Sequence, residues 1–192
     1  MSNEPITQPS MRDMHTRATK DAILRAAMEL FSTHGYAETG VRDIARQARV
    51  NQALIARYFG SKIELYSEVL KEALDISHFT NVSRETFGEQ LAKNFCTSPA
   101  ESASIVPLLI YAAGDSTARD AALGLLAERV IKPLGTWFGE PEASERAAQF
   151  LAVVTGFFAY RLMLPVSTIG SDPSPAMQRW LAATLQEIVD RH

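Results

Sequence analysis

The sequence predicts an all-α protein. Apolar residues recur at helical spacing from about residue 16 to the C-terminus, and no segment of useful length shows the alternation typical of a strand. Glycines and prolines separate these periodic segments and indicate where the helices end. The chain has 192 residues, 46% hydrophobic and 21% charged, so it can bury a core without disulfides.

The first 15 residues are polar, contain Pro5 and Pro9 and lack periodicity, so we expect a disordered tail there. The tail has no apolar segment typical of a signal peptide. The longest uncharged stretch, residues 147–160, is too short to cross a membrane. The single cysteine, Cys96, excludes an internal disulfide and a multi-cysteine metal site. We therefore expect a cytoplasmic protein without a membrane partner, a metal or a cofactor.

Three short helices are predicted between residues 16 and 60. The first covers residues 16–34 and ends before Gly35, which suits the position after a helix. The second covers residues 41–48, with Gly40 as its N-cap, and the third covers residues 52–59. Together they form the first predicted domain, residues 16–60.

The second predicted domain, residues 61–192, contains longer and more apolar helices. Its first helix begins after Ser61, because Ser61 and Glu64 have the spacing of a capping box. Pro107 either kinks or splits one of the later helices, and Pro175 fits the first position of the last one. Beyond residue 77 we expect helices at residues 83–97, 102–113, 117–138, 142–164 and 174–191.

The net charge of −3 is unevenly distributed along the chain. Residues 1–60 contain 8 basic and 6 acidic residues, whereas residues 61–192 contain 11 basic and 16 acidic residues. The positive excess at the N-terminal end favours a contact with nucleic acid there. The acidic remainder should face away from phosphate.

Residues 39–62, TGVRDIARQARVNQALIARYFGSK, have the spacing of a helix-turn-helix. Two short helices are joined by a turn of a few residues, Ala45 allows the second helix to approach closely, and Val50 fills the turn. In this motif the second helix enters the major groove of duplex DNA with its N-terminus first. The segment therefore predicts a protein that binds double-stranded DNA in a sequence-specific way.

The outer face of the second helix carries side chains suited to DNA. Gln52 can contact an adenine edge, and Arg57 a guanine edge or a phosphate. Ala53 is small enough to touch thymine methyl groups, and Lys62 lies at a helix N-terminus that attracts phosphate. The candidate DNA contacts are Arg42, Asn51, Gln52, Ala53, Leu54, Arg57, Tyr58 and Lys62.

Four stretches carry a family resemblance: IL-x-AA-x-ELF-x-x-HGY from Ile23, VRDIA from Val41, A-x-V from Ala48 and YFGSK from Tyr58. As a set they resemble the N-terminal DNA-binding domain of the TetR family of bacterial regulators. The resemblance implies an all-helical homodimer of about nine helices per subunit. It also implies a repressor that a small ligand releases from DNA, with an activator of the same fold as the alternative.

Three residues depart from the family pattern. The family usually has glycine at the position of Arg49, where the turn prefers a positive φ, so either Arg49 is strained by about 1 kcal/mol or the turn differs. Arg49 itself either contacts DNA or is a solvated turn residue. At the position of Gly40 the family often has serine or threonine. At the position of Ala56 it usually has a tyrosine that binds phosphate, and in this chain Arg57 and Tyr58 would take over that contact.

The two helices that close the chain form the dimer interface in the family, as a four-helix bundle across a two-fold axis. The alternative for their apolar residues is a core within one subunit, and such helices often serve both purposes. A two-fold dimer would bind a near-palindromic operator. The candidate interface residues are Phe150, Val154, Phe157, Phe158, Arg161, Trp180, Leu181, Thr184, Leu185 and Ile188.

The middle helices carry aromatic and aliphatic residues that are candidates for an effector pocket. Because no buried charge pair is evident among them, we expect a small effector that is mostly apolar or aromatic. The candidate pocket residues are Phe87, Leu91, Phe95, Leu109, Tyr111, Trp137, Phe138 and Tyr160.

Two other classes of protein are less consistent with the sequence. An enzyme is not indicated, because there is no nucleophile elbow, glycine-rich phosphate loop or metal-spaced cluster of histidine and cysteine. A helix-turn-helix protein that binds a protein partner would not need the cations Arg42, Arg57 and Lys62 around its second helix.

Overall fold

The computed structural model describes residues 11–97, 105–165, 167, 169–170 and 172–191, without the side chains of residues 12 and 78. All regular structure in this part of the chain is helical, as predicted. The elements are α1 (Met11–Glu38), α2 (Val41–Ala48), α3 (Gln52–Phe59), α4 (Lys62–Ala73), α5 (Ser77–Thr80), η1 (Arg84–Thr86), α6 (Phe87–Thr97), α7 (Ile105–Ala112), α8 (Ser116–Leu126), η3 (Ala127–Ile131), α9 (Lys132–Phe138), α10 (Ala143–Phe158), η4 (Ala159–Met163) and α11 (Pro175–Asp190).

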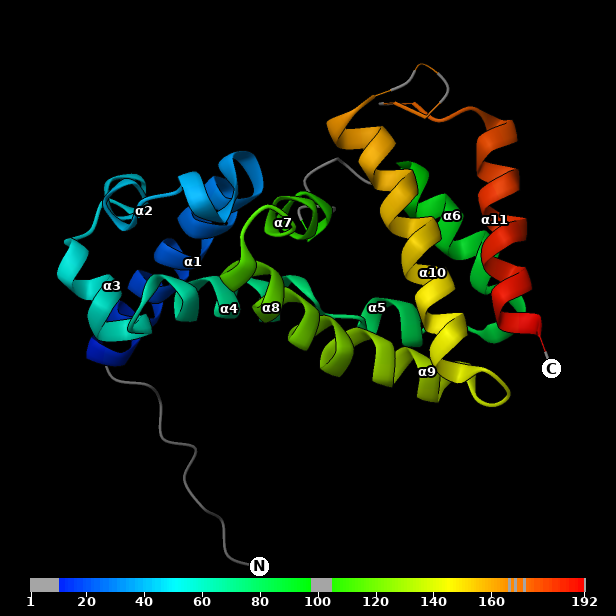
Figure 1. The fold of residues 1–192 in the computed structure, drawn as a ribbon, viewed down its shortest axis with the longest axis horizontal. Coiled ribbons are helices and arrows are strands. Elements are labelled where there is room, and N and C mark those ends of the chain that lie inside the picture. Colours follow the sequence, from blue (N-terminus) through cyan, green and yellow to red (C-terminus); the bar gives the residue numbers. More distant parts are fainter. Residues whose placement is uncertain (1–10, 98–104, 166, 168, 171, 192) are drawn as a thin grey trace, which may run out of the picture.

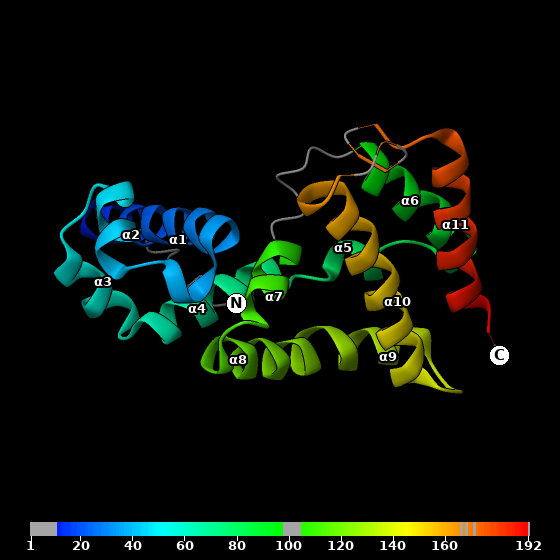
Figure 2. The same ribbon diagram turned by 45° about the horizontal axis from the view of Figure 1, so that its top comes forward.

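The molecule is elongated (Figures 1 and 2). Helices α1, α2 and α3 lie at one end, which we call the N-terminal end, and α6, α10 and α11 lie at the other, the C-terminal end. Helices α4, α7 and α8 connect the two. The two predicted domains therefore meet along α4 and its neighbours.

The first helix starts earlier than predicted. α1 begins at Met11 instead of residue 16, whereas residues 1–10 of the expected tail lie outside the described part of the chain. In this first turn Met11 is 80% exposed and Met14 is 47% exposed. Because the turn has no buried face, its sequence shows no apolar periodicity from which a helix could be predicted. Gly35 has a φ of 78° and interrupts the helical backbone where the sequence predicted its end.

Helices α2, α3 and α4 have the predicted starts. Gly40 is an extended N-cap without a side-chain acceptor. The capping box before α4 is confirmed, since Ser61 Oγ accepts from Glu64 N at 3.3 Å and Glu64 Oε2 accepts from Ser61 N at 2.7 Å. These local patterns position the helix-turn-helix on α1 and α4.

The later helices follow the predicted segments with changes inside them. The predicted helix at residues 117–138 is a run of α8, the π-helical η3 and α9, and η4 is a second π-helical segment after α10. Helix α5 was not predicted. Pro107 lies within α7 (Ile105–Ala112), which continues beyond it to Ala112.

Arg146 of α10 joins two helix ends at the C-terminal end of the molecule. Its side chain is 1% exposed. Nε donates to the carbonyl of Ile188 at 2.8 Å and Nη2 to that of Val189 at 2.7 Å, in the last turn of α11. Nη1 donates to the carbonyl of Gly139, after α9, at 3.1 Å. Burial lowers the pKa of this guanidinium.

Two further arginines bind helix C-termini in the same way. Arg161 of η4 donates to the carbonyl of Cys96 in α6 at 3.2 Å. Arg84 of η1 donates to the carbonyl of Phe138 at the end of α9 at 2.9 Å. The last carbonyls of a helix have no hydrogen-bond partner within the helix and carry the negative end of its dipole. An arginine side chain at this place supplies hydrogen-bond donors to these carbonyls, and its positive charge interacts favourably with the dipole.

Helices α6 and α11 pack closely at Gly88. A Cβ atom there would lie 2.1 Å from the carbonyl oxygen of Ala182 in α11, so only glycine permits this approach. Gln186 reinforces the contact, since its Oε1 accepts from Gly88 N at 2.9 Å. Helix α11 therefore packs mainly against α6 rather than α10.

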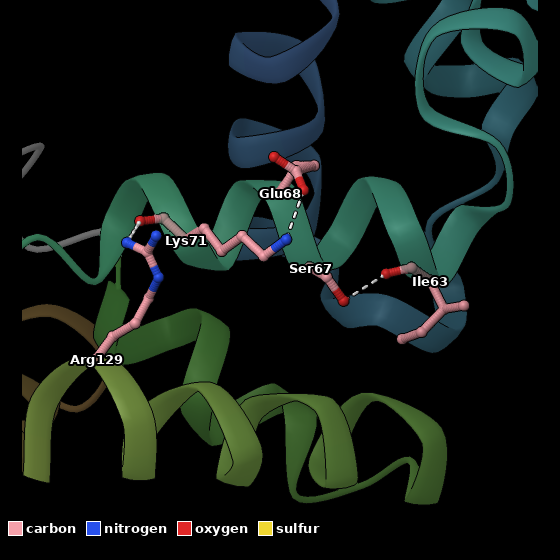
Figure 3. A network of polar contacts seen from close by, with 5 residues as sticks. All are labelled: Ile63, Ser67, Glu68, Lys71 and Arg129. Carbon is pink, nitrogen blue, oxygen red and sulfur yellow. Dashed lines mark hydrogen bonds and ion pairs between the residues drawn. The ribbon is translucent and has the colours of Figure 1, made fainter. Parts of the chain in front are cut away.

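Two hydrogen bonds connect α4 to the helices beneath it. The hydroxyl of Tyr66 donates to the carbonyl of Leu108 in α7 at 3.1 Å. Arg129 of η3 donates to the carbonyl of Lys71 at 3.1 Å, while the Lys71 ammonium pairs with Glu68 at 2.7 Å (Figure 3). The middle of α4 is thus bonded to α7 and its last turn to η3.

Candidate functional site

The turn between α2 and α3 fixes the angle between these two helices. Arg49 has a φ of 55° and a ψ of 42°, which is the left-handed conformation, so of the two alternatives the strained arginine applies. The amide of Val50 donates to the carbonyl of Ala45 at 3.0 Å. The turn thus keeps its left-handed geometry with arginine in place of glycine, and the strain stays in the backbone.

The outer face of α3 is accessible, as predicted. Gln52, Ala53, Ala56 and Arg57 are exposed, whereas Ile55 is 1% exposed and faces the core. This face combines hydrogen-bonding groups with small side chains that allow close approach. Such a surface can enter a major groove and contact base edges.

One of the candidate DNA contacts also has a structural role. Asn51 is the N-cap of α3, and its Oδ1 accepts from Ala53 N at 2.8 Å. Another candidate, Leu54, is only partly exposed. Asn51 therefore orients the first turn of α3 whether or not it touches DNA.

The cations around α3 differ in their surroundings. Arg42 and Arg57 are exposed. Lys62 is partly buried, with Nζ 4.2 Å from the ring centroid of Tyr36 and 3.4 Å from the carbonyl oxygen of Ala37. Burial lowers the pKa of the Lys62 ammonium, although Asp115 partly opposes this effect. Within the chain, the Lys62 ammonium thus has one carbonyl acceptor and one aromatic neighbour.

One cation beside the predicted contacts was missed at the sequence level. Lys20 of α1 lies over the ring of Tyr58, with its Nζ 5.6 Å from the ring centroid, and Arg57 lies 5.9 Å from the same ring on the α3 side. Arg17 and Lys20 are spaced by three residues on the exposed face of α1, which was the available signal. Tyr58 thus lies between cations of two helices.

A cavity of about 680 Å³ lies in the second domain. Three of the predicted pocket residues, Leu91, Phe95 and Leu109, line it. The other five do not. Phe87, Trp137 and Phe138 instead form an aromatic cluster with Phe150, while Tyr111 is 40% exposed and Tyr160 50% exposed, both outside the cavity. Aromatic side chains at helical spacing mostly fill the core, so the spacing alone predicted more pocket residues than the cavity has.

Several lining residues come from segments that the sequence did not connect with a pocket. Met28 belongs to α1, and Ala73 and Leu74 lie at the end of α4. The polar lining residues include Glu72 and Asp75. The cavity thus adjoins the two helices that carry the helix-turn-helix, which only the packing of distant segments reveals.

The predicted interface residues belong mostly to the core of the single chain. Seven of them are 8% exposed or less, namely Phe150, Phe157, Phe158, Arg161, Leu181, Leu185 and Ile188. Val154 and Thr184 are partly exposed, and Trp180 is 53% exposed. The buried seven pack against α6, α9 and each other, so their side chains cannot supply most of a contact between two subunits. The alternative of an intramolecular core applies to them.

The described residues contain no group of three or more histidine, cysteine, aspartate or glutamate side chains arranged to hold a metal ion. In the same part of the chain, no helix combines the length and the apolar character that crossing a membrane requires.

Two family models match the chain. Residues 23–69 match the model of bacterial regulatory proteins of the tetR family. Residues 85–189 match the model of the tetracyclin repressor-like C-terminal domain. The second match alone covers more than half of the sequence, and the first includes the whole helix-turn-helix segment, residues 39–62.

Curated relatives match about a third of the chain. The HTH-type transcriptional repressor Rv3405c of Mycobacterium tuberculosis is 39% identical over 70 residues, which are 36% of this chain and 37% of the relative. The HTH-type transcriptional repressor SCO4008 of Streptomyces coelicolor is 44% identical over 61 residues, 31% of this chain and 32% of the relative. The match thus spans about a third of each relative's length.

Solved structures share the whole fold. A TetR-family transcriptional regulator from Rhodococcus sp. superposes with a TM-score of 0.72 at 15% identity, over 91% of this chain and 100% of the other. A transcriptional regulator from Saccharomonospora viridis, solved in complex with choline, superposes with a TM-score of 0.64 at 15% identity, over 88% and 96% of the two chains. At these identities the likeness concerns the fold.

Proposed function

Because the chain belongs to the TetR family of bacterial regulatory proteins, we propose that it represses transcription as a homodimer and that a small effector releases it from DNA. The relatives named above are transcriptional regulators rather than enzymes. One observation carries the proposal: the cavity is lined by residues of α1 and α4, and in the helix-turn-helix α1 packs against α2 and α4 packs against α3. A protein of this kind acts on the chromosome, in the cytoplasm.

In this proposal α3 lies in the major groove. Gln52, Ala53 and Arg57 contact base edges, and Arg42 and Tyr58 hold phosphates on either side. Lys20, next to Tyr58, adds a further phosphate contact from α1. The acidic second domain faces away from the duplex.

The contacts of α3 can be tested by two substitutions. Arg57→Ala and Gln52→Ala should each weaken specific operator binding by about 1–3 kcal/mol, because each removes a base contact. Lys93→Ala, which removes an exposed cation from α6, is the matched control and should leave binding unchanged. Fluorescence anisotropy with a duplex selected from random sequence measures all three. Unchanged affinity in both α3 variants would exclude α3 as the recognition helix.

Dimerisation is proposed for the outer faces of α10 and α11, at the end of the molecule remote from α3 (Figure 1). Trp180 is the largest exposed apolar side chain there and is the expected anchor. A two-fold dimer would place its two α3 helices in successive major grooves, roughly 34 Å apart, on a near-palindromic operator.

Trp180→Glu should therefore shift the protein toward monomer in light scattering. Because Trp180 is exposed, the variant is expected to keep the fold, and circular dichroism checks this. Leu185 and Phe157 are unsuitable sites for the same test, since their burial within one subunit would make any substitution affect folding. An unaltered dimer would place the interface elsewhere.

Release by an effector requires that ligand binding favour one spacing of the two α3 helices. α4 connects the cavity to the helix-turn-helix, since Tyr66 and Lys71 are bonded to α7 and η3 and Ala73 lines the cavity. A coupling of about 1–3 kcal/mol is typical for such systems. The effector must bind one spacing more tightly than the other, because equal affinity would shift nothing.

The release step is tested by titrating candidate effectors into the protein–operator complex. The proposal expects at least one compound that occupies the cavity to lower operator affinity. The alternative, an activator of the same fold, is distinguished by transcription from the selected operator. A repressor lowers transcription without effector, whereas an activator raises it.

A further inference from the structure

The cavity has an apolar body. Most of its described lining residues are aliphatic or aromatic, and phenylalanines from separate helices contribute, among them Phe79, Phe95, Phe150 and Phe158. A volume of about 680 Å³ lies in the range of small-molecule sites. The body of a ligand in this space would be a hydrocarbon chain or an aromatic ring system.

The charged groups of the cavity are of one sign. Glu72, in the last turn of α4, and Asp75, just after it, are both lining residues and both exposed toward solvent. Oδ1 of Asp75 accepts from Ser77 N at 2.9 Å. Among the described residues that line the cavity, none is lysine, arginine or histidine.

The end of α4 adds to this negative potential. α4 ends at Ala73, and both Ala73 and Leu74 line the cavity. The C-terminus of a helix carries the negative end of its dipole, and phenyl faces also attract cations. Arg129 donates to the Lys71 carbonyl in the same turn. Because Arg129 does not line the cavity, its positive charge opposes the negative potential only from outside.

We propose that the effector is an amphipathic organic cation, with an apolar body among the phenylalanines and one positive headgroup at Glu72 and Asp75. This inference rests on the proposed function, because it assigns the charge of the effector to the same cavity. It sharpens the sequence-level expectation of a mostly apolar effector. A carboxylate of the same shape would be repelled, and a neutral molecule would gain only the apolar contacts.

Three probes with one ten-carbon chain separate charge from hydrophobicity: decyltrimethylammonium, 1-decanol and decanoate, each used well below its micelle concentration. Calorimetry with the full chain, without DNA, measures their binding to the cavity. Decyltrimethylammonium should bind most tightly and decanoate most weakly, with steps of roughly threefold to tenfold for partly solvated charges. Equal affinities, a tighter decanoate or no binding by any probe would overturn the proposal.

Variants locate the effect. Glu72→Gln should lower the affinity for decyltrimethylammonium roughly threefold to tenfold and leave 1-decanol unchanged, because it removes one charge at nearly constant shape. Asp75→Asn keeps an oxygen that can accept from Ser77 N, and the double variant should lose the preference for the cation. Glu89→Gln is the matched control, since Glu89 is an exposed residue of α6 that does not line the cavity.

A separate measurement distinguishes this inference from the proposed function. Operator affinity is measured with each probe at saturation. If 1-decanol or decanoate binds best and releases the operator, the charge assignment is wrong and the proposed function stands. If the chain binds no selected duplex, the proposed function fails, whereas the calorimetric order of the probes still decides the charge. A preference for the cation that persists in the double variant would contradict the role of Glu72 and Asp75.

Discussion

Arginines at the two ends of the molecule are used differently. At the N-terminal end, Arg42 and Arg57 are exposed beside the outer face of α3. At the C-terminal end, Arg146 and Arg161 are buried and donate to carbonyls in the last turns of α11 and α6. The same side chain is thus free to contact a partner in one region and completes the backbone hydrogen bonds of a helix in the other. Counting basic residues does not separate these roles, because burial decides between them.

The largest expected effect comes from removing a buried arginine. Arg146→Met should lower the free energy of unfolding by about 3–5 kcal/mol, since it leaves buried carbonyls of α11 without a partner and creates a small void. Arg57→Met is the matched variant at the other end and should leave stability unchanged while weakening operator binding. Urea unfolding measures the free energy of unfolding of both variants. Equal losses of stability would contradict the different roles of the arginines at the two ends.

A second test concerns how closely the C-terminal end is packed. Gly88→Ala should lower the free energy of unfolding by about 2–3 kcal/mol, because the added methyl group would meet the backbone of α11 and force the helices apart. Gly124→Ala in α8 is the control, since no atom lies within 4 Å of the added Cβ. There the substitution should stabilise the helix by about 1 kcal/mol. Thermal or urea unfolding that ranks the two variants in the opposite order would contradict the close approach.

The third test concerns Tyr66, which bonds α4 to α7 between the two ends. Tyr66→Phe should cost about 1 kcal/mol at neutral pH, because the hydrogen bond to Leu108 is lost. Burial raises the pKa of Tyr66 from 10.0 to about 12. The folded protein therefore holds this proton more tightly than the unfolded chain, so its contribution is complete below pH 10 and is lost as the pH rises toward 12.

Between pH 9 and pH 12, the free energy of unfolding should therefore fall less in the Tyr66→Phe variant than in the unsubstituted protein. Urea unfolding at a series of pH values measures this difference. Tyr160→Phe is the control, because Tyr160 is 50% exposed. Identical alkaline profiles for the Tyr66 variant and the unsubstituted protein would show that the phenol does not titrate differently on folding.

The smallest expected effect is at the strained turn. Arg49 and Glu142 both have a positive φ, one in each region. Replacing either with glycine should change stability by only about +0.5 kcal/mol, since relief of left-handed strain exceeds the added freedom of the unfolded chain by little. Operator affinity distinguishes the two positions. If Arg49→Gly lowers the affinity for the operator and Glu142→Gly does not, Arg49 contacts DNA.

The sequence predicted the N-terminal end closely because the relevant interactions are local. Ser61 and Glu64 form their capping box within one turn, Gly35 ends the regular part of α1, and the outer face of α3 follows from the inward position of Ile55. Each of these features depends on residues a few positions apart. The start of α1 at Met11 was missed because an exposed first turn has no apolar pattern to detect.

By itself, the sequence determined an all-helical chain with a helix-turn-helix and the starts of α2, α3 and α4, but it left open whether the turn at Arg49 is left-handed. Only the tertiary structure decided which apolar side chains surround a cavity, which fill the core of one subunit, and which cations are enclosed. Met28 and Phe158 line one cavity although 130 positions separate them in the chain. Helical periodicity shows that a side chain faces inward, whereas its neighbours there depend on how distant helices pack.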